Sequence, residues 1–514
     1  MTPAVATPAA GARTGSRVRL DVVAWSVAAV VFVVHALVAG RYDAFRNELY
    51  FIVCGRHPAF GYVDQPPLVP LLAAFTQIFG DDVWLLRLPA VAAAALLVPL
   101  TVSLARLMGA GNPGAWIAAV AAATAPLVVA VTSTLGTPTF EPLLWTLVAY
   151  LLVRALERDE PRCLIWGGIV AGVAFEAKYG IAVWLLGLAA GIVLTPARRI
   201  ASREFWIGLA CAAVLALPNV AWQAQHQFPF LEVVRNDNAG NLTGSPPAFL
   251  IDQAFGANLV LLPLWLAGII APFAMQRLAA FRFLAIAFVV ALVAVFATHG
   301  KNYYLAGAYP TIFALGAAAC TALARPLVAL WMVLTAANAA LTLPFVLPVL
   351  NADSLAHYLS RAAIRPRPVE VAGIGAPLTQ VFSDEFGWRE LEQRVARVYR
   401  ALPAGERARA AILASNYGEA AAIDVYGVPD RLPPAISEQN QYFLWGPRGY
   451  DGSIVIAVNG KPEFWSRVCA SSSVAATFGV PYAMPYERDR DIIVCRGLPV
   501  PLANAWPRFK RYGI

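Results

Sequence analysis

The chain has 514 residues, of which 59% are hydrophobic and only 14% are charged, and its formal net charge is +8. Soluble domains carry roughly 25% charged residues, so this composition excludes an ordinary soluble protein and predicts an all-α polytopic membrane protein. The basic residues are nearly all arginines in short clusters between apolar runs. This pattern is typical of membrane orientation and gives no sign of nucleic-acid binding.

Residues 1–19 are rich in Ala, Thr, Pro and Gly, and we expect them to form a flexible cytoplasmic tail. Apolar segments then recur up to residue 350, and about 20 apolar residues cross the ~30 Å hydrocarbon layer of a bilayer. Residues 20–350 are therefore expected to form one transmembrane domain. About eleven transmembrane helices are predicted, near residues 21–40, 86–107, 114–132, 139–155, 164–176, 181–196, 204–221, 250–273, 280–297, 303–323 and 327–350.

Arginines recur in alternate connections between these segments. By the positive-inside rule, such connections face the cytoplasm. The other connections, among them residues 41–85, and the chain after residue 350 are then expected on the periplasmic face of a bacterial inner membrane. The arginines that set this orientation are Arg13, Arg17, Arg19, Arg106, Arg154, Arg158, Arg162, Arg198, Arg199, Arg203, Arg277, Arg282 and Arg325.

Residues 351–514 contain more charged residues and short alternating apolar runs, which predicts a small extracytoplasmic α/β domain. The apolar runs at 410–414, 453–458 and 491–495 are predicted strands. A helix is expected over residues 417–426, opened by Asn416.

Two of the six cysteines, Cys469 and Cys495, fall in this last segment. In an oxidising compartment they are candidates for a disulfide, and the alternative is two buried thiols. The other four cysteines lack the spacing of metal ligands.

Four ionisable residues stand out between or beside the apolar segments. Glu48 and Asp64 lie in the 41–85 connection, and Lys178 and Lys301 are the only lysines before residue 351. Ionisable groups at a membrane boundary are costly unless they serve a function, and a lysine is a compact cation suited to a phosphate. The four residues together predict a site for an anionic lipid-linked substrate and for a nucleophile that must lose a proton.

The leaving group determines the chemistry that such a site has to supply. A sugar carried on a lipid phosphate leaves an anionic phosphate without a general acid, so one carboxylate acting as base on the acceptor hydroxyl suffices. A cation beside the phosphate stabilises the charge that grows there. We therefore predict an inverting single displacement that moves a sugar from a lipid phosphate to an acceptor hydroxyl. No cofactor is required, although Glu48 and Asp64 are alternative ligands for a divalent metal ion.

Several motifs resemble the GT-C membrane glycosyltransferases, specifically the family 39 group that includes protein O-mannosyltransferase-like and aminoarabinose-lipid A transferase-like proteins. The resemblance covers about residues 20–325 and implies the GT-C fold. It also implies transfer of a hexose or pentose from a polyprenyl-phosphate donor to an envelope lipid, glycan or protein. Its motifs are Asn47-Glu48-Leu49-Tyr50, Gly61-Tyr62-Val63-Asp64-Gln65-Pro66-Pro67-Leu68, Arg87-Leu88-Pro89-Ala90, Ala177-Lys178-Tyr179 and Gly300-Lys301-Asn302-Tyr303-Tyr304.

The resemblance also implies roles for single residues. The family usually has an Asp-Glu pair in the first loop with the Asp as base, whereas this chain has Asn47 and Glu48 at those positions. Glu48 is therefore expected to act as the base, and Asp64 to orient the acceptor or bind a divalent ion. The residues expected to bind the donor phosphate are Lys178, Lys301, Tyr303 and Tyr304. The candidates for binding the rest of the substrate are Asn47, Tyr62, Gln65 and Arg87.

Other interpretations stay open at this point. Glu48 has the alternative role of a surface helix charge, Asp64 that of a turn cap, and the two lysines that of interfacial anchors. At the level of function, the alternatives are a membrane transporter and a non-catalytic envelope-assembly scaffold with a GT-C-like fold.

Overall fold

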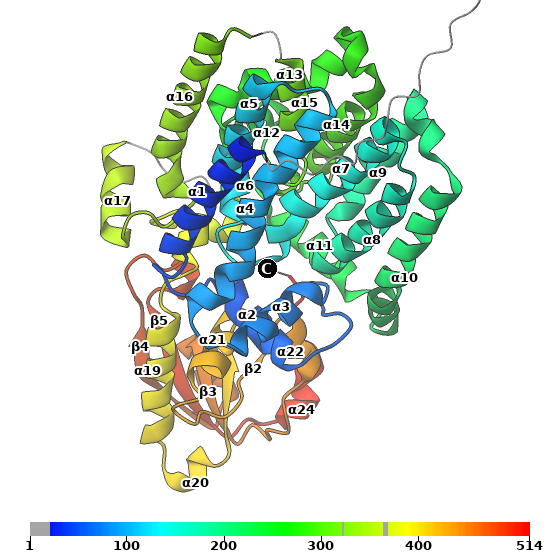
Figure 1. Ribbon diagram of the computed structural model, residues 1–514. Helices are drawn as coiled ribbons and strands as arrows, with labels where there is room; N and C mark the ends of the chain where they lie inside the picture. Colours follow the sequence, from blue (N-terminus) through cyan, green and yellow to red (C-terminus); the bar gives the residue numbers. More distant parts are fainter. Residues whose placement is uncertain (1–20, 321–322, 363–367, 514) are drawn as a thin grey trace, which may run out of the picture.

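The computed structural model describes residues 21–320, 323–362 and 368–513. A bundle of helices forms one part of the molecule, and the other part contains a β-sheet (Figure 1). The helices of the first part are α1 (Val22–Val38), α4 (Val83–Leu107), α5 (Asn112–Thr124), α6 (Pro126–Val131), α7 (Glu141–Arg158), α8 (Arg162–Ala177), α9 (Ile181–Leu194), α10 (Arg203–Gln225), α11 (Pro229–Gly240), α12 (Pro246–Gly256), α13 (Leu262–Ala274), α14 (Arg282–Ala297), α15 (Tyr309–Ala319), α16 (Arg325–Thr342) and α17 (Ala352–Arg361).

By length and hydropathy, five helical segments of the described chain are able to cross a membrane, or six if α12 and the segment Leu259–Ala274, bent by 99°, form one span. The predicted number of about eleven is not confirmed. Some predicted spans are interrupted: the 114–132 segment is divided between α5 and α6 just before Pro126, a residue that cannot donate the backbone hydrogen bond a continuous helix needs. The helical arrangement is nevertheless that of a polytopic membrane protein.

The lipid-facing character of two helices is evident from their surfaces. In both α10 and α16, only 11% of the most apolar window is buried inside the protein. Apolar side chains such as Trp206, Leu217 and Val333 are exposed there. In a bilayer these side chains contact acyl chains, so the exposed apolar surface needs no protein partner.

The 41–85 connection is not an open loop, because it folds into the helices α2 (Arg46–Arg56) and α3 (Leu68–Gln77). The two helices lie between the bundle and the sheet (Figure 1). Their apolar residues share one hydrophobic core with the C-terminal part, in which Tyr50 and Phe51 pack with Trp388, Ile412 and Tyr442. This shared core fixes the polar end of α2 against residues more than 300 positions away.

We refer to residues 388–513 as the sheet region. Its five strands have the order β2-β1-β3-β5-β4, in which β1 is parallel to β2 and β3 while β5 is antiparallel to β3 and β4. The strands are β1 (Ala410–Ala414), β2 (Ile436–Ser437), β3 (Ile454–Gly460), β4 (Ser471–Phe478) and β5 (Arg490–Arg496). The helices of this region are α19 (Trp388–Ala401), α20 (Ala404–Arg407), α21 (Tyr417–Tyr426), α22 (Asn440–Trp445), α23 (Pro462–Val468) and α24 (Leu502–Ala505), and α18 (Gln380–Ser383) precedes it.

Short 3-10 helices link these elements. They lie at Thr137–Phe140, Pro196–Ile200, Leu259–Leu261, Gln276–Phe281, Asn302–Leu305, Leu343–Phe345, Val371–Gly373, Pro485–Glu487 and Trp506–Phe509.

The sequence predicted three of the strands and one helix of this region. Strands β1, β3 and β5 lie at the predicted apolar runs, and Asn416 caps α21 by accepting a hydrogen bond from the Glu419 amide at 2.9 Å. Strand β4 was missed because it is a largely exposed edge strand that begins with three serines and lacks an apolar run.

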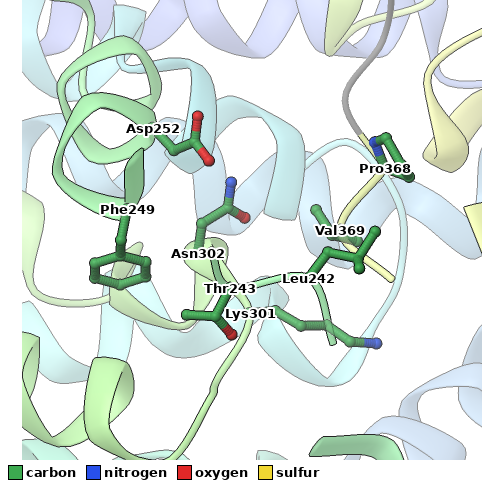
Figure 2. Close-up of a pocket in the computed structure, with 8 residues that line it drawn as sticks. All are labelled: Leu242, Thr243, Phe249, Asp252, Lys301, Asn302, Pro368 and Val369. Atoms are coloured by element: carbon green, nitrogen blue, oxygen red, sulfur yellow. The ribbon is translucent and has the colours of Figure 1, made fainter. Parts of the chain in front are cut away.

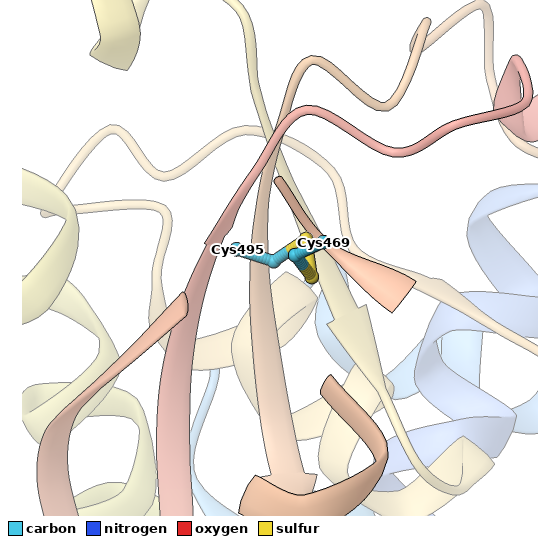
Figure 3. Close-up of a disulfide and its surroundings, with 2 residues drawn as sticks. All are labelled: Cys469 and Cys495. Atoms are coloured by element: carbon cyan, nitrogen blue, oxygen red, sulfur yellow. A yellow bond between two sulfur atoms is a disulfide. The ribbon is translucent and has the colours of Figure 1, made fainter. Parts of the chain in front are cut away.

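Cys469 and Cys495 form a disulfide, which resolves the two alternatives in favour of pairing. The bond ties β5 to the residue that precedes β4 by two positions (Figure 3). The sequence separation is 26 residues, so the bridge closes the loop that contains the exposed edge strand.

Candidate active site

A cavity of about 430 Å³ lies where the helical bundle, α2 and the sheet region meet. It brings together residues that the sequence analysis had selected from four separate segments: Asn47, Asp64, Gln65, Lys178, Lys301, Tyr303 and Tyr304. Its other polar residues include Arg46, Tyr50, Tyr179, Asp237, Asn238, Tyr417 and Asn440. The cavity is therefore the candidate active site.

Asp64 presents its carboxylate to this cavity from a tight turn, in which the Tyr62 amide donates to the Gln65 carbonyl at 3.0 Å. The Tyr50 hydroxyl donates to Asp64 Oδ1 at 2.9 Å, and the Asn440 amide donates to Asp64 Oδ2 at 3.1 Å. Burial raises the pKa of Asp64 to about 6, although both hydrogen bonds oppose the rise. A carboxylate with this pKa is ionised near neutral pH and is a stronger base than an exposed aspartate.

Two amides of α10 hold the turn from the membrane side. Asn219 donates to the Phe60 carbonyl at 2.9 Å, and Gln223 donates to the Tyr62 carbonyl at 2.9 Å. Both are buried on a helix whose surface is otherwise largely exposed and apolar. The Tyr179 hydroxyl donates to Asn219 Oδ1 at 2.8 Å and extends this network to the cavity wall. The polar positions of α10 are thus explained by the turn that they support.

The sheet region holds the same turn from the opposite side. The side-chain Oε1 of Gln441 accepts from the Val63 backbone amide at 3.1 Å. The backbone amide of Gln441 donates to the Tyr50 hydroxyl, also at 3.1 Å. Asn440 has a positive φ of 49°, a conformation that asparagine tolerates better than most residues. Its side-chain oxygen accepts from the Gly513 amide at 2.9 Å, which orients its NH₂ group toward Asp64.

The two predicted lysines line the cavity, and each has a carboxylate partner outside the lining. Lys178 Nζ lies 3.1 Å from Glu141 Oε2, and Lys301 Nζ lies 2.5 Å from Glu370 Oε2. The Lys178 ammonium also lies 4.3 Å from the Tyr304 ring centre and 5.5 Å from that of Tyr303. These contacts order the ammonium groups at the wall, where their remaining N–H donors are available to an anion.

The contact between Lys301 and Glu370 shifts the pKa values of both groups. Burial works against the charge on Lys301, yet Glu370 raises the lysine's pKa above its usual value. Burial likewise opposes ionisation of Glu370, but Lys301 and Arg46 lower its pKa below the usual range. Both groups are therefore charged at neutral pH.

Three predicted site residues lie outside the lining of this cavity. Glu48 is fully buried and accepts hydrogen bonds from the backbone amides of Phe45 at 2.8 Å and Leu135 at 2.7 Å. Arg87 lies 2.8 Å from Glu48 Oε2 and 2.9 Å from Glu385 Oε2. Tyr62 is buried as well, and its hydroxyl donates to the Cys54 carbonyl at 2.8 Å. These three residues join α2 to its neighbours.

The Arg87 triad contains one cation and two carboxyl groups. Burial raises the pKa of Glu385 to about 8, with Arg87 opposing the rise and Glu48 adding to it. Near neutral pH one proton therefore resides largely on this carboxyl, and the buried charges balance.

Asn47 and Gln65 do line the cavity. The Tyr417 hydroxyl donates to Asn47 Oδ1 at 2.8 Å. Gln65 is almost fully buried, and its Oε1 lacks a hydrogen-bond partner among the described residues. An unsatisfied buried acceptor at a cavity wall is suited to a hydroxyl-bearing ligand.

Sequence reasoning missed Arg46, Tyr50, Tyr417 and Asn440. Arg46 precedes the Asn47-Glu48-Leu49-Tyr50 motif and Tyr50 is its last residue, and neither was given a role in the site although both are buried on α2. Their position beside or within the motif was the available signal. Tyr417 and Asn440 come from the sheet region and reach the cavity only through tertiary folding.

A smaller cavity of about 50 Å³ lies beside Lys301 and is lined by α12, the segment after α11 and residues 368–369. Figure 2 shows Lys301 at one side of it, with Phe249 and Asp252 projecting from α12. It has room for little more than a water molecule or two, so it does not offer a second substrate site.

A divalent ion held by Glu48 and Asp64 gains no support from the geometry. Glu48 is enclosed by Arg87 and backbone amides, whereas Asp64 faces the cavity. Within the described ranges, His, Cys, Asp and Glu form no group of three or more that is able to hold a metal. We therefore derive no step through a metal.

Comparisons with known proteins agree with this architecture. Residues 64–222 match the family model described as dolichyl-phosphate-mannose-protein mannosyltransferase. The lipid A galacturonosyltransferase RgtD of Rhizobium johnstonii is 32% identical over 189 residues, which is 36% of this chain. The match spans 39% of that relative's length.

Two solved structures share the fold over most of the chain. ArnT from Cupriavidus metallidurans, bound to undecaprenyl phosphate, matches with a TM-score of 0.60 and 15% identity over 92% of this chain and 97% of its own. The arabinofuranosyltransferase AftD from Mycobacteria matches with a TM-score of 0.51 and 15% identity over 92% of this chain and 40% of its own. Both likenesses concern the fold.

The helical bundle with a small C-terminal sheet is the architecture that this chain shares with these structures. The matched segment makes residues 64–222 similar to that mannosyltransferase family, and the fold of the chain is similar to that of the GT-C membrane glycosyltransferases.

Proposed function

We propose that the protein transfers a sugar from a polyprenyl phosphate to an acceptor hydroxyl on the periplasmic face of a bacterial inner membrane. The observation that carries this proposal is the meeting of Asp64, Lys178 and Lys301 around one cavity at the end of the helical bundle. The relatives support it, since RgtD is a lipid A galacturonosyltransferase and the ArnT structure contains undecaprenyl phosphate.

In the proposed reaction, Asp64 accepts the proton of the acceptor hydroxyl. The hydroxyl oxygen forms a new bond to the anomeric carbon as the bond from that carbon to the phosphate oxygen breaks, and the electron pair leaves with the phosphate. This single displacement inverts the anomeric configuration. The phosphate is already anionic, so the departing group needs cations and not an acid.

Lys178 and Lys301 are the proposed phosphate ligands. Their carboxylate partners Glu141 and Glu370 hold the ammonium groups at the cavity wall from outside the lining. Tyr303 and Tyr304 complete this side of the cavity. The prenyl chain is proposed to run from here into the bilayer along the membrane helices.

Asp64, and not Glu48, is the base that we propose. A base has to come within about 3 Å of the proton it removes. Glu48 is fully buried and already bound by Arg87 and by backbone amides, so an acceptor has no access to it. We assign Glu48 and Arg87 to positioning α2, on which Asn47 and Tyr50 reach the cavity.

The test uses purified full-length protein in proteoliposomes and a panel of polyprenyl-phosphate hexoses and pentoses. The proposal predicts acceptor-dependent release of polyprenyl phosphate from at least one donor. Consumption of none, together with movement of a labelled donor across the vesicle membrane, would favour the transporter alternative.

A further inference from the structure

A second and larger cleft, of about 570 Å³, lies along one edge of the sheet region. Arg46 lines both this cleft and the candidate active site, so the two spaces adjoin at its side chain. The other residues at the cleft wall are Val371, Ala372, Ile374, Ser415, Asn416, Gln439, Asn459, Lys461, Pro485, Tyr486, Arg490 and Arg511.

The position of the cleft follows from the sheet topology. Strands β1, β2 and β3 are parallel, so their carboxyl ends meet at one edge, where Ser415, Gln439 and Lys461 follow the three strands. Strand β1 lies between β2 and β3, and the chain leaves it toward β2 and then passes to β3 on its other side. A crevice at such a reversal is where open α/β sheets commonly bind ligands.

The charge of the cleft is uniform. Arg46, Lys461, Arg490 and Arg511 line it, and the described lining contains no carboxylate. Arg46 has Asp384 as its ion-pair partner at 3.9 Å, and Arg511 has Glu438 at 3.5 Å. Lys461 and Arg490 form no ion pair with a carboxylate of the described chain. Four cations around one cleft with two of them unpaired favour an anion.

Arg46 also shows how an occupant would be linked to the catalytic cavity. Its side chain is more than nine-tenths buried, packs over the rings of Tyr417 and Tyr486, and contacts the Tyr486 hydroxyl. Its Nε is enclosed by protein and lies 3.9 Å from Asp384 Oδ1. Because the Arg46 side chain lines both cavities, it is placed to contact a ligand that extends through both.

We propose that this cleft is the acceptor site and that it binds an anionic saccharide, one that carries a phosphate or a carboxylate. The inference rests on the proposed function and adds the chemical class of the acceptor. In this proposal the anion is bound by Lys461, Arg490 and Arg511, which line the cleft together. The acceptor then reaches past Arg46, so that one of its hydroxyls comes to Asp64.

The occupant is the acceptor and not the donor because of where the two cavities lie. Lys178 and Lys301 stand next to the ends of membrane helices α8 and α14, where the phosphate of a lipid embedded in the bilayer is within reach. The cleft is formed mainly by loops of the sheet region, beyond α2. A water-exposed headgroup suits this position better than a prenyl phosphate does.

The test measures direct binding to full-length protein in phosphatidylcholine nanodiscs, with glucosamine 1-phosphate, glucuronate and inorganic phosphate as probes. The cleft variant is Lys461→Gln/Arg490→Gln. The matched control is Arg394→Gln/Arg397→Gln, which removes two exposed charges from α19, outside this cleft. Loss of two charge-assisted contacts should weaken binding of the sugar anions at least about tenfold in the cleft variant. The control variant should stay within about twofold of the wild type.

Several outcomes would overturn the proposal. Equal weakening in the cleft and control variants would mean a diffuse charge effect, and equal affinity for inorganic phosphate and glucosamine 1-phosphate would rule out a saccharide site. If phosphatidylglycerol included in the protein's own nanodiscs competes with the probes for binding, the cleft would be assigned to membrane lipid. Release of polyprenyl phosphate, measured in parallel, reports on the proposed function separately, since the cleft variant keeps Lys178, Lys301 and Asp64.

Discussion

The side-chain amide of Asn440 donates to Asp64 Oδ2 at 3.1 Å, although 376 residues separate the two along the chain. The helical bundle supplies the lysines of the candidate site, and the sheet region orients its carboxylate. The sheet region is therefore part of the candidate site and not an appendage.

The activity should depend on pH through Asp64. Its pKa is raised to about 6, so the fraction in the basic form falls as the pH drops below that value. We expect kcat/KM to decline about tenfold per pH unit below pH 6 and to level off above it. A pH profile of donor consumption measures this directly, and a profile that is flat from pH 4.5 to 7.5 would exclude Asp64 as the base.

Tyr50→Phe should move that profile to higher pH. The Tyr50 hydroxyl donates to Asp64 and lowers the carboxyl pKa, so its loss leaves burial less opposed and raises the pKa further. The expected result is a shift of the acidic midpoint upward with little change in the plateau rate. A lower plateau with an unchanged midpoint would instead mean that Tyr50 only supports the fold.

Glu48→Gln should act on stability. Removal of one partner from a buried ion pair costs about 3–5 kcal/mol when the other charge is left unpaired, and the cost here is smaller because Glu385 still lies 2.9 Å from Arg87. We expect a measurable fall in the thermal midpoint in detergent. The variant Glu48→Gln/Arg87→Met, which removes both charges, should recover part of the loss. A Glu48→Gln protein with wild-type stability and no turnover would return Glu48 to the role of base.

The contribution of Lys178 to donor binding is separable from its ion pair. Glu141→Gln removes the buried partner and leaves the cation at the cavity wall, so polyprenyl phosphate should bind as tightly as in the wild type or more so. Adding Lys178→Met to this variant should weaken binding about tenfold, the worth of one charge-assisted hydrogen bond. Equal affinity of the two variants would place the phosphate elsewhere.

The disulfide should stabilise the sheet region without taking part in the reaction. A bridge over 26 residues contributes roughly 3 kcal/mol in the chain-entropy model. Cys469→Ala/Cys495→Ala should lower the thermal midpoint and leave turnover of the folded protein unchanged at low temperature. A loss of turnover at full stability would mean that the bridge shapes the site.

The sequence predicted those parts of the site that are unusual where they stand. Asp64, Lys178 and Lys301 were recognisable because ionisable residues beside apolar segments are rare, and they meet around one cavity. The role of Glu48 in the Asn47-Glu48-Leu49-Tyr50 motif was harder to predict from the sequence. In the sequence alone, Glu48 resembles a catalytic residue. Only the folded position of Arg87, 39 residues away, shows that the charge of Glu48 is neutralised inside the protein.

Other features depend on tertiary structure and left no local signal. The hydrogen bonds of Asn440 and Tyr417 to the first motifs follow from the packing of the sheet region on α2. The number of spans was hard to predict because Pro126 and the bend after α12 interrupt apolar runs without changing their hydropathy. Composition thus indicated the membrane class, while the helix boundaries required the structure.

The most direct test of the central claim is transfer of a labelled sugar from polyprenyl phosphate in proteoliposomes by wild-type protein, Asp64→Asn and the α19 control Arg394→Gln. Asparagine keeps the shape of the aspartate but accepts no proton at neutral pH, so Asp64→Asn should lose about 10²–10⁴-fold in turnover while it still binds polyprenyl phosphate. Arg394→Gln should match the wild type. Turnover by Asp64→Asn within a few-fold of the wild type would contradict the assignment of Asp64 as the base.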